Sequence, residues 1–210
     1  MDVAVLAYDG MTALDAVGPA QVLAGMPGAR VRWVAAEPGP KRTDCGMAIV
    51  AEDSIGTLAR PDIVLVPGAL DVRPVMKDDR VLAWLRTAHE TTRWTTSVCT
   101  GALILGAAGL LEGKRATTHW LMLEKLAAFG AEPVADRVVV DGKLITGAGV
   151  SAGIDLALRL LQTIAGDAVA QTVQLAIEYD PAPPFSAGSP KSAPPDVLEA
   201  ARRALSRASA

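Results

Sequence analysis

Residues 94–111, WTTSVCTGALILGAAGLL, form the stretch of sequence that decides the fold. The first five residues are typical of a buried β-strand, and apolar side chains spaced three and four apart over residues 100–111 indicate a helix. No loop residues separate the two segments, so Cys99 is expected on a sharp and strained turn between them. The stretch therefore predicts a nucleophile elbow, with Cys99 as the candidate nucleophile.

Further strand-like and helix-like segments alternate on both sides of this unit. Apolar runs predict strands at residues 3–8, 31–36 and 62–67, and helical spacing of apolar residues predicts helices at residues 16–26 and 78–90. Because strands and helices alternate, we expect a mostly parallel, doubly wound α/β sheet. The Asp141-Gly142 pair within residues 138–146 is a strong turn signal and predicts one antiparallel β-hairpin.

The rest of the chain divides into the end of one domain and an extension. Apolar helices are expected at residues 151–165 and 167–178, both packed on the sheet. Six of the 14 prolines lie in residues 181–195, which is too many for a packed element, and residues 196–205 have an amphipathic helical pattern. We predict a single α/β domain over residues 1–180. A proline-rich C-terminal extension over residues 181–210 is expected to end in a short helix and to pack on the same domain.

Composition argues against several classes of protein. The 210-residue chain has 20 basic and 23 acidic residues and a net charge of −3, without long blocks of one sign, so nucleic-acid binding is not expected. No apolar run reaches the length of a membrane span. The N-terminus has no signal-peptide pattern, so a cytoplasmic location is expected. The two cysteines and two histidines are not spaced as metal ligands, so no metal site is expected.

Cys99 is the leading candidate for a catalytic residue. A thiol at a helix N-terminus lies near free backbone amides that favour the thiolate, and Gly101 would let a neighbouring strand approach closely. The alternative interpretation is a small buried cysteine that fills a tight turn. Cys45 lies in a polar stretch typical of a surface turn, and we assign it no role.

A nucleophile normally needs a partner for proton transfer, and the histidines are poor candidates. His89 lies near the end of a predicted helix, where a cationic ring would complement the helix dipole. His119 is expected to cap or line the start of the next helix, with a supporting role near the site. A Cys-His-Asp triad is therefore not expected.

A carboxyl group and a backbone amide are better placed than the histidines. Asp15 follows the first strand, and ligands in open α/β sheets bind outside the carboxyl ends of the strands, so Asp15 is expected beside Cys99. Its alternative role is the N-cap of a helix starting at Ala16, and the two roles can coexist. Gly68 follows the strand at residues 62–67 and could offer a backbone N–H to developing negative charge, or be an ordinary turn glycine.

Several motifs resemble those of the ThiJ/PfpI superfamily. They are SVCTGA at residues 97–102, GAAGLLEGKRATTHW at residues 106–120 and AGID at residues 152–155. Within that superfamily, LDAVGP at residues 14–19 and EYDPAPPF at residues 178–185 resemble the isonitrile hydratases, so the resemblance covers nearly the whole chain. It implies a flavodoxin-like three-layer α/β sandwich, a homodimer, a cysteine nucleophile with a nearby acidic residue, and no cofactor.

Carried over to this sequence, the resemblance makes Cys99 the nucleophile and Asp15 its acidic partner, with Thr100 orienting water or holding Asp15. Many protease-like and stress-protein relatives have histidine in place of Thr100, which argues against peptide hydrolysis. Gly68 and Ala69 stand where a glycine pair is often found, so a backbone-amide role at Gly68 is retained and the methyl group of Ala69 reshapes the pocket.

The implied activity is the hydration of a small-molecule isonitrile, R–N≡C, to an N-substituted formamide. One alternative is a non-catalytic ligand or oxidation sensor, and another is a glyoxalase-like or deglycase-like activity on small dicarbonyls. Superfamily members in transcription regulators precede a helix-turn-helix domain. The proline-rich residues after Tyr179 leave no room for one, so we expect none here.

Overall fold

The computed structural model describes residues 1–208 of the chain. Its main sheet has seven strands in the order β10-β11-β7-β6-β1-β2-β5. These strands are β1 (Asp2–Leu6), β2 (Arg30–Ala35), β5 (Asp53–Ser54), β6 (Ile63–Val66), β7 (Trp94–Val98), β10 (Val138–Asp141) and β11 (Leu144–Gly147). All neighbours pair in parallel except β10 and β11. The predicted mostly parallel sheet is confirmed.

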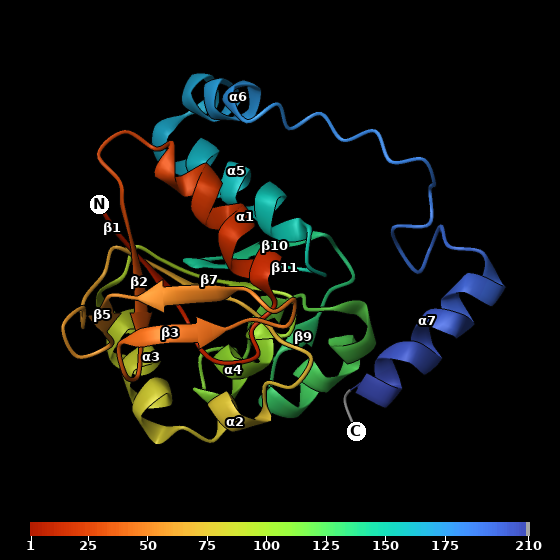
Figure 1. Cartoon of the computed structure of the whole chain (residues 1–210), viewed down its shortest axis with the longest axis horizontal. Helices are drawn as coiled ribbons and strands as arrows, with labels where there is room; N and C mark the ends of the chain where they lie inside the picture. The colour runs from red at the N-terminus through yellow and green to blue at the C-terminus, as the bar shows by residue number, and fades with distance from the viewer. Residues whose placement is uncertain (209–210) are drawn as a thin grey trace.

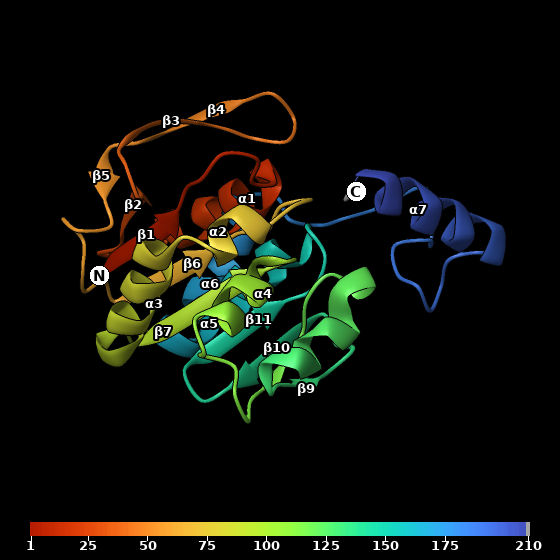
Figure 2. The same ribbon diagram turned by 90° about the horizontal axis from the view of Figure 1, so that it is seen from below.

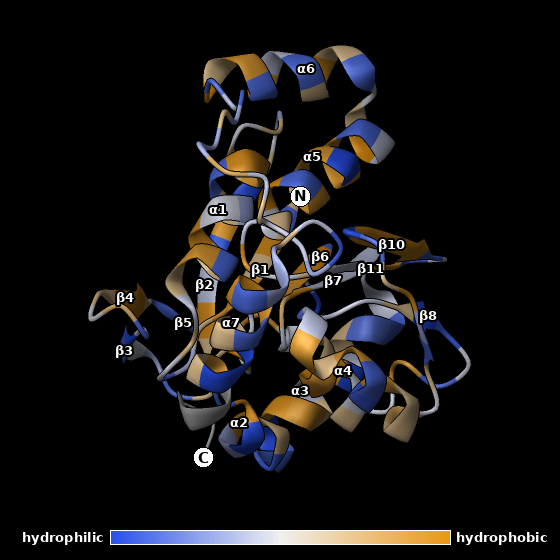
Figure 3. Ribbon diagram, turned by 90° about the vertical axis from the view of Figure 1, so that its right-hand side faces the viewer, coloured by the Kyte–Doolittle hydropathy of each residue, from blue (hydrophilic) through white to orange (hydrophobic). Residues whose placement is uncertain are grey.

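Helices cover both faces of this sheet and complete three layers (Figure 1). On one face lie α1 (Ala13–Ala24) and α5 (Ala152–Ala165); on the other lie α2 (Arg73–Met76), α3 (Asp79–Thr91) and α4 (Gly101–Ala107). α6 (Asp167–Ala176) packs on α5 and not, as predicted, on the sheet. Strands β1 and β6 are buried on both sides, which explains their continuous apolar sequence. Figure 3 shows hydrophobic and hydrophilic residues interleaved along α5 and α6, as expected for helices with one buried face. The fold is the flavodoxin-like sandwich that the motifs imply.

The antiparallel hairpin forms one edge of the sheet. β10 and β11 pair from Val138 opposite Gly147 to Asp141 opposite Leu144. Gly142, in the turn, has a φ of +60°, a left-handed conformation that glycine adopts without steric cost. The hairpin expected from the Asp-Gly pair is confirmed.

Two helices have different limits from those predicted. α1 begins at Ala13, with Thr12 as its N-cap residue, so Asp15 lies inside the first turn. The alternative prediction of Asp15 as an N-cap is therefore wrong. The helix begins three residues before Ala16, where the predicted apolar spacing starts. α4 ends at Ala107 rather than at residue 111, since Gly109 adopts a φ of +78° that a right-handed helix cannot continue through.

Smaller elements lie outside the main sheet. They are the antiparallel ribbon of β3 (Gly39–Arg42) and β4 (Ala48–Ala51), the parallel pair of β8 (Arg115–Ala116) and β9 (Glu132–Pro133), and the 3₁₀ helix η1 (Trp120–Phe129). Figure 2 shows the β3–β4 ribbon projecting beyond the sandwich. Its turn returns to the body at Asp44, whose Oδ1 accepts a hydrogen bond of 3.2 Å from the Ala13 N–H. A carboxylate therefore lies at the start of α1.

The C-terminal extension leaves the sandwich after α6. The predicted final helix is confirmed as α7 (Pro195–Ala208), and the segment that leads to it is extended and mostly exposed. Figures 1 and 2 show α7 to one side of the sandwich, and the Arg202 guanidinium lies 5.9 Å from the centre of a Trp120 ring. Packing of the whole extension on the domain stays a prediction. No helix within residues 1–208 is long and apolar enough to cross a membrane.

Candidate active site

Cys99 occupies the turn between β7 and α4. Its φ of +56° lies in the left-handed region that residues with side chains rarely adopt, so the predicted strained elbow is confirmed. The Cys99 N–H donates to the carbonyl oxygens of Gly147 and Ala148 at 3.0 and 2.8 Å. The Thr118 hydroxyl donates to the Cys99 carbonyl oxygen at 2.7 Å. Hydrogen bonds on both sides of the residue therefore hold the strained backbone in place.

Gly101, the first residue of α4, lets the elbow approach the neighbouring strand. A Cβ atom at this position would lie 2.2 Å from the Val66 carbonyl oxygen and 3.0 Å from that of Pro67. No side chain fits at such distances from a backbone, so the position requires glycine. The close approach expected from the sequence is confirmed, and it brings Cys99 beside the loop that follows β6.

Asp15 reaches the same place from α1. Its side chain is fully buried, and Oδ2 accepts a hydrogen bond of 2.9 Å from the Gly68 N–H. Oδ1 makes no hydrogen bond of ordinary geometry with any described residue, although the Cys99 thiol interacts with the carboxylate. Burial raises the pKa of Asp15 to about 7; the Gly68 and Cys99 contacts lower it and the charge of Asp44 raises it. The carboxyl group is therefore partly protonated at neutral pH.

The Cys99 thiol is the second titratable group of this pair. Burial and then the negative charge of Asp15 raise the pKa of Cys99 to about 12, against hydrogen bonds from Thr100 and from the Val150 N–H that lower it. The expectation that backbone amides favour the thiolate is confirmed in direction, because the amides of Thr100 and Val150 lower this pKa, but burial and the neighbouring carboxylate outweigh them. The two groups interact, so they titrate as a pair.

Thr100 and the loop after β6 hold one another in place. The Thr100 hydroxyl donates to the Ala69 carbonyl oxygen at 2.7 Å and accepts from the Ala69 N–H at 2.9 Å. A Cβ atom on Gly68 would lie 2.5 Å from Thr100 Oγ1 and 3.0 Å from Asp15 Oδ2. The N–H groups of Gly68 and Ala69 thus already have partners, Asp15 and Thr100. Binding of developing negative charge by these amides stays a prediction, which requires one of them to exchange its partner.

His119 lies next to the site and is the N-cap residue of η1. Its Nδ1 accepts a hydrogen bond of 3.4 Å from the Leu121 N–H, so the expected capping role is confirmed. Burial lowers the pKa of His119, which favours the neutral ring. A Cβ atom on Gly149 would lie 3.2 Å from His119 Cδ2, so the ring packs against the residue that precedes Val150. Its supporting role in catalysis stays a prediction.

The other histidine and the other cysteine have different surroundings. His89 Nδ1 shares a hydrogen bond of 2.8 Å with Thr95 Oγ1, and burial followed by the charge of Lys143 lowers the pKa of His89. The expected cationic ring at this helix end is therefore wrong. Cys45 is exposed in the turn of the β3–β4 ribbon. Among the described residues, no group of three or more His, Cys, Asp or Glu side chains is arranged to hold a metal ion.

Three residues of the site were not predicted from the sequence. The Tyr8 hydroxyl donates to the Pro67 carbonyl oxygen at 2.8 Å, Thr118 holds the carbonyl group of Cys99, and the Val150 N–H reaches the thiol. Tyr8 is the last residue of the apolar run that predicts a strand, so its sequence context indicates no site role. A backbone amide such as that of Val150 leaves no pattern in a sequence. The threonine pair within the motif at residues 106–120 is the one available signal for Thr118.

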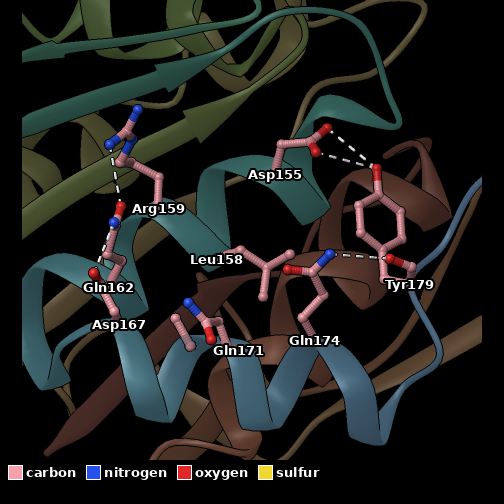
Figure 4. A pocket seen from close by; sticks show the side chains of 9 residues that line it. Asp155, Leu158, Arg159, Gln162, Asp167, Gln171, Gln174 and Tyr179 are labelled. Carbon is pink, nitrogen blue, oxygen red and sulfur yellow. Dashed lines mark hydrogen bonds between the residues drawn. The ribbon is translucent and has the colours of Figure 1, made fainter.

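A separate polar groove of about 380 Å³ lies between α5 and α6 (Figure 4). Several of its polar side chains bind one another: the Tyr179 hydroxyl donates to Asp155 at 3.2 Å, and Gln174 donates to the Tyr179 carbonyl oxygen at 3.2 Å. Neither Cys99 nor Asp15 lines this groove. The groove is therefore distinct from the candidate active site.

A flavodoxin-like sandwich with a strained cysteine elbow at the carboxyl ends of its strands defines a class of α/β proteins built around a potential nucleophile. A model of the DJ-1/PfpI family matches residues 1–163. The chain belongs to the DJ-1/PfpI family, which confirms the resemblance found in the motifs.

Individual relatives extend this similarity beyond the matched residues. The chain is 44% identical over 203 residues to an isonitrile hydratase from Pseudomonas putida, covering 97% of this chain and 89% of that protein. It is 29% identical to the HTH-type transcriptional regulator CdhR from Pseudomonas aeruginosa, over 79% of this chain and 50% of the regulator. A ThiJ/PfpI family protein of known structure from Pseudomonas syringae is 40% identical, with a TM-score of 0.93 and coverage of 99% and 88%. DJ-1beta from Drosophila melanogaster, at 22% identity and a TM-score of 0.76 over 84% of this chain and 97% of that one, shares the fold.

Proposed function

We propose that this protein is an isonitrile hydratase that converts R–N≡C into R–NH–CHO. The observation that carries the proposal is the interaction of the Cys99 thiol with the buried Asp15 carboxyl group. The pKa of this carboxyl group is raised to about 7. The pair offers a nucleophile and a proton at one point, and hydration requires both at the terminal carbon of the isonitrile. The 44% identity to an isonitrile hydratase over nearly the whole chain supports the same activity.

In the first stage, sulfur and hydrogen both add to the terminal carbon of the isonitrile. Protonated Asp15 donates its proton to this carbon, and the Cys99 sulfur forms a bond to it. The thiol proton passes to Asp15 and replaces the proton that Asp15 gave to the carbon. The product is a thioimidate, R–N=CH–S–Cys99, with Asp15 protonated again. A thiol with a raised pKa suits this relay, because its proton leaves as the bond to carbon forms.

In the second stage, water attacks the thioimidate carbon. Asp15 donates its proton to the nitrogen and accepts one from the water, which gives the tetrahedral adduct R–NH–CH(OH)–S–Cys99. The carbon–sulfur bond then breaks, and the hydroxyl proton passes through Asp15 to the sulfur. The formamide and the free thiol result, without any cofactor. We assign the orientation of the water to Thr100, whose hydroxyl also reaches the Cys99 thiol.

Incubation with cyclohexyl isonitrile, followed by mass spectrometry for the formamide, tests this proposal. The unmodified protein is expected to form the formamide, and Cys99→Ala is expected to stay folded and form none. Cys45→Ser is the matched control, since the Cys45 thiol is exposed and outside the site. Lack of product with the unmodified protein would reject the function, and normal turnover by Cys99→Ala would reject the mechanism.

The same assay separates the two alternatives. A non-catalytic sensor would bind the isonitrile or be oxidised at Cys99 without multiple turnovers. A glyoxalase-like enzyme would convert methylglyoxal. We expect this protein to convert methylglyoxal more slowly than the isonitrile, because the residue after Cys99 is Thr100 and not a histidine that could transfer protons in such chemistry.

A further inference from the structure

Tyr8 lies beyond the end of β1, close enough to Asp15 and Cys99 for their charges to act on its phenol. The residue is 8% exposed, and its hydroxyl donates a hydrogen bond of 2.8 Å to the Pro67 carbonyl oxygen. β1 and β6 are neighbours in the sheet, so residues just beyond the two strand ends are brought together. A buried phenol thus binds the backbone of the loop that carries Gly68.

The bond acts on one rigid unit, because the Pro67 carbonyl and the Gly68 N–H belong to the same peptide group. No cis peptide occurs in the described residues, so this group is trans, and its C=O and N–H point in opposite directions. One end is held by Tyr8 at 2.8 Å, and the other donates to Asp15 Oδ2 at 2.9 Å. Rotation of the peptide plane would weaken both bonds together.

The Pro67–Gly68 peptide is tightly packed on both sides, so its orientation affects the residues around it. Gly101 packs against it so closely that a Cβ atom would lie 3.0 Å from the Pro67 carbonyl carbon and oxygen. On the other side, Thr100 and Asp15 leave no room for a side chain on Gly68. The peptide therefore lies between the elbow and Asp15, and any change in its tilt is transmitted to the carboxylate.

Tyr8 keeps its donor proton throughout the pH range in which Asp15 titrates. Burial and the negative charges of Asp15, Cys99 and Asp44 raise the pKa of Tyr8 well above its usual value. These three are the acidic groups that act on the phenol, and they come from α1, the elbow and the β3–β4 turn. Removal of the hydroxyl group therefore deletes a hydrogen bond and changes no charge near neutral pH.

We propose that Tyr8 is a positioning residue of the active site: its hydroxyl holds the Pro67–Gly68 peptide so that the Gly68 N–H stays on Asp15. The inference rests on the proposed function, in which Asp15 must alternate between its protonated and ionised forms. The Gly68 N–H can donate to the ionised carboxylate and so stabilises it. With this donor misaligned, Asp15 would hold its proton too tightly to pass it on.

The test compares Tyr8→Phe with Tyr179→Phe, the matched deletion of the other tyrosine hydroxyl in the chain. The pKa of Asp15 is measured by NMR on protein labelled with ¹³C at aspartate carboxyl groups, with Asp15→Asn to assign the signal. Tyr8→Phe is expected to raise this pKa by about half a unit or more and to speed exchange of the Gly68 amide hydrogen. Tyr179→Phe should change neither quantity, because its hydroxyl binds Asp155 instead.

Identical Asp15 titration and Gly68 exchange in Tyr8→Phe and the unmodified protein would overturn the proposal. If Tyr8→Phe does not fold, 3-fluorotyrosine is incorporated in the Tyr179→Phe background, where Tyr8 is the one tyrosine left. The stronger phenol donor should lower the pKa of Asp15 and slow Gly68 exchange, and no change in either would also overturn the proposal. Neither readout needs turnover, so failure of the isonitrile assay and failure of this inference are distinguishable.

Discussion

The Gly68 amide, in the loop after β6, and the Asp15 carboxylate, in the first turn of α1, lie 53 residues apart in sequence and form a hydrogen bond of 2.9 Å. The donor has no side chain, and none would fit between Thr100 and Asp15. The site thus depends on a backbone group whose direction is set by packing around it.

Gly68→Ala should damage the site through this crowding. The added methyl group would lie 2.5 Å from Thr100 Oγ1, 2.6 Å from the Thr100 backbone nitrogen and 3.0 Å from Asp15 Oδ2, so the backbone at Gly68 or Thr100 must shift. We expect at least a tenfold loss of kcat/KM and a loss of about 1–3 kcal/mol in the free energy of unfolding. Gly188→Ala is the matched control, since nothing lies within 4 Å of its added methyl group. Equal activity in the two variants would show that the site tolerates the displacement.

Asp15→Asn tests the proton relay. Asparagine retains an acceptor for the Gly68 N–H but cannot supply the carboxyl proton, so isonitrile hydration should slow at least about a hundredfold in a folded protein. In the unmodified protein, kcat/KM should be highest with Asp15 protonated and should fall as pH rises through about 7. Kinetics from pH 5 to 9 measure both effects. Near-normal turnover by Asp15→Asn, with an unchanged pH profile, would assign the acid to another group.

Asp44→Asn should move that pH profile. The charge of Asp44 raises the pKa of Asp15, so its removal should lower the pKa and shift the falling limb of kcat/KM to lower pH. Asparagine keeps an oxygen acceptor for the Ala13 N–H, which preserves the start of α1. Asp196→Asn, on α7, serves as the control for a lost surface charge. A shift to higher pH in Asp44→Asn would have the wrong sign for this electrostatic argument.

The stability of the protein should also depend on the titration of Asp15. Its pKa is about 7 in the folded chain, against 3.8 for the unperturbed group, so the folded state binds this proton more tightly. The resulting stabilisation is present below pH 4 and is lost as pH rises to 7, by up to about 4 kcal/mol. Urea unfolding should therefore show that Asp15→Asn gains stability relative to the unmodified protein between pH 4.5 and pH 8. The same difference at both pH values would contradict the raised pKa.

A homodimer is expected from the resemblance, with its two-fold interface close to the Cys99 elbow. Leu14 and Leu70 adjoin the site residues Asp15 and Ala69 in sequence and are 42% and 46% exposed, which supplies apolar surface near the site. Light scattering at micromolar concentration should give about twice the 21.7 kDa mass of the chain, and Leu14→Glu should lower it toward one chain. A monomeric mass for the unmodified protein would reject this expectation.

Sequence alone determined the strands β1, β2, β6 and β7, every described α-helix except α2, the hairpin at Asp141-Gly142 and the elbow at Cys99. It did not predict the β3–β4 ribbon, β5, the β8–β9 pair or the limits of η1. The predicted features depend on short-range rules: apolar periodicity, turn residues, and the direct junction of a strand with a helix. Asp15 could be placed near Cys99 for a topological reason, because the carboxyl ends of parallel strands lie at one edge of the sheet.

Only the tertiary structure decided the protonation of the pair and the partners that set it. Local sequence predicts a thiolate at a helix N-terminus, yet burial and the charge of Asp15 raise the pKa of Cys99 to about 12. The hydrogen bond from Tyr8 to Pro67 and the bond from Gly68 to Asp15 join residues more than 50 positions apart. Burial and such long-range contacts depend on how the elements pack in space, and no local pattern of residues records them.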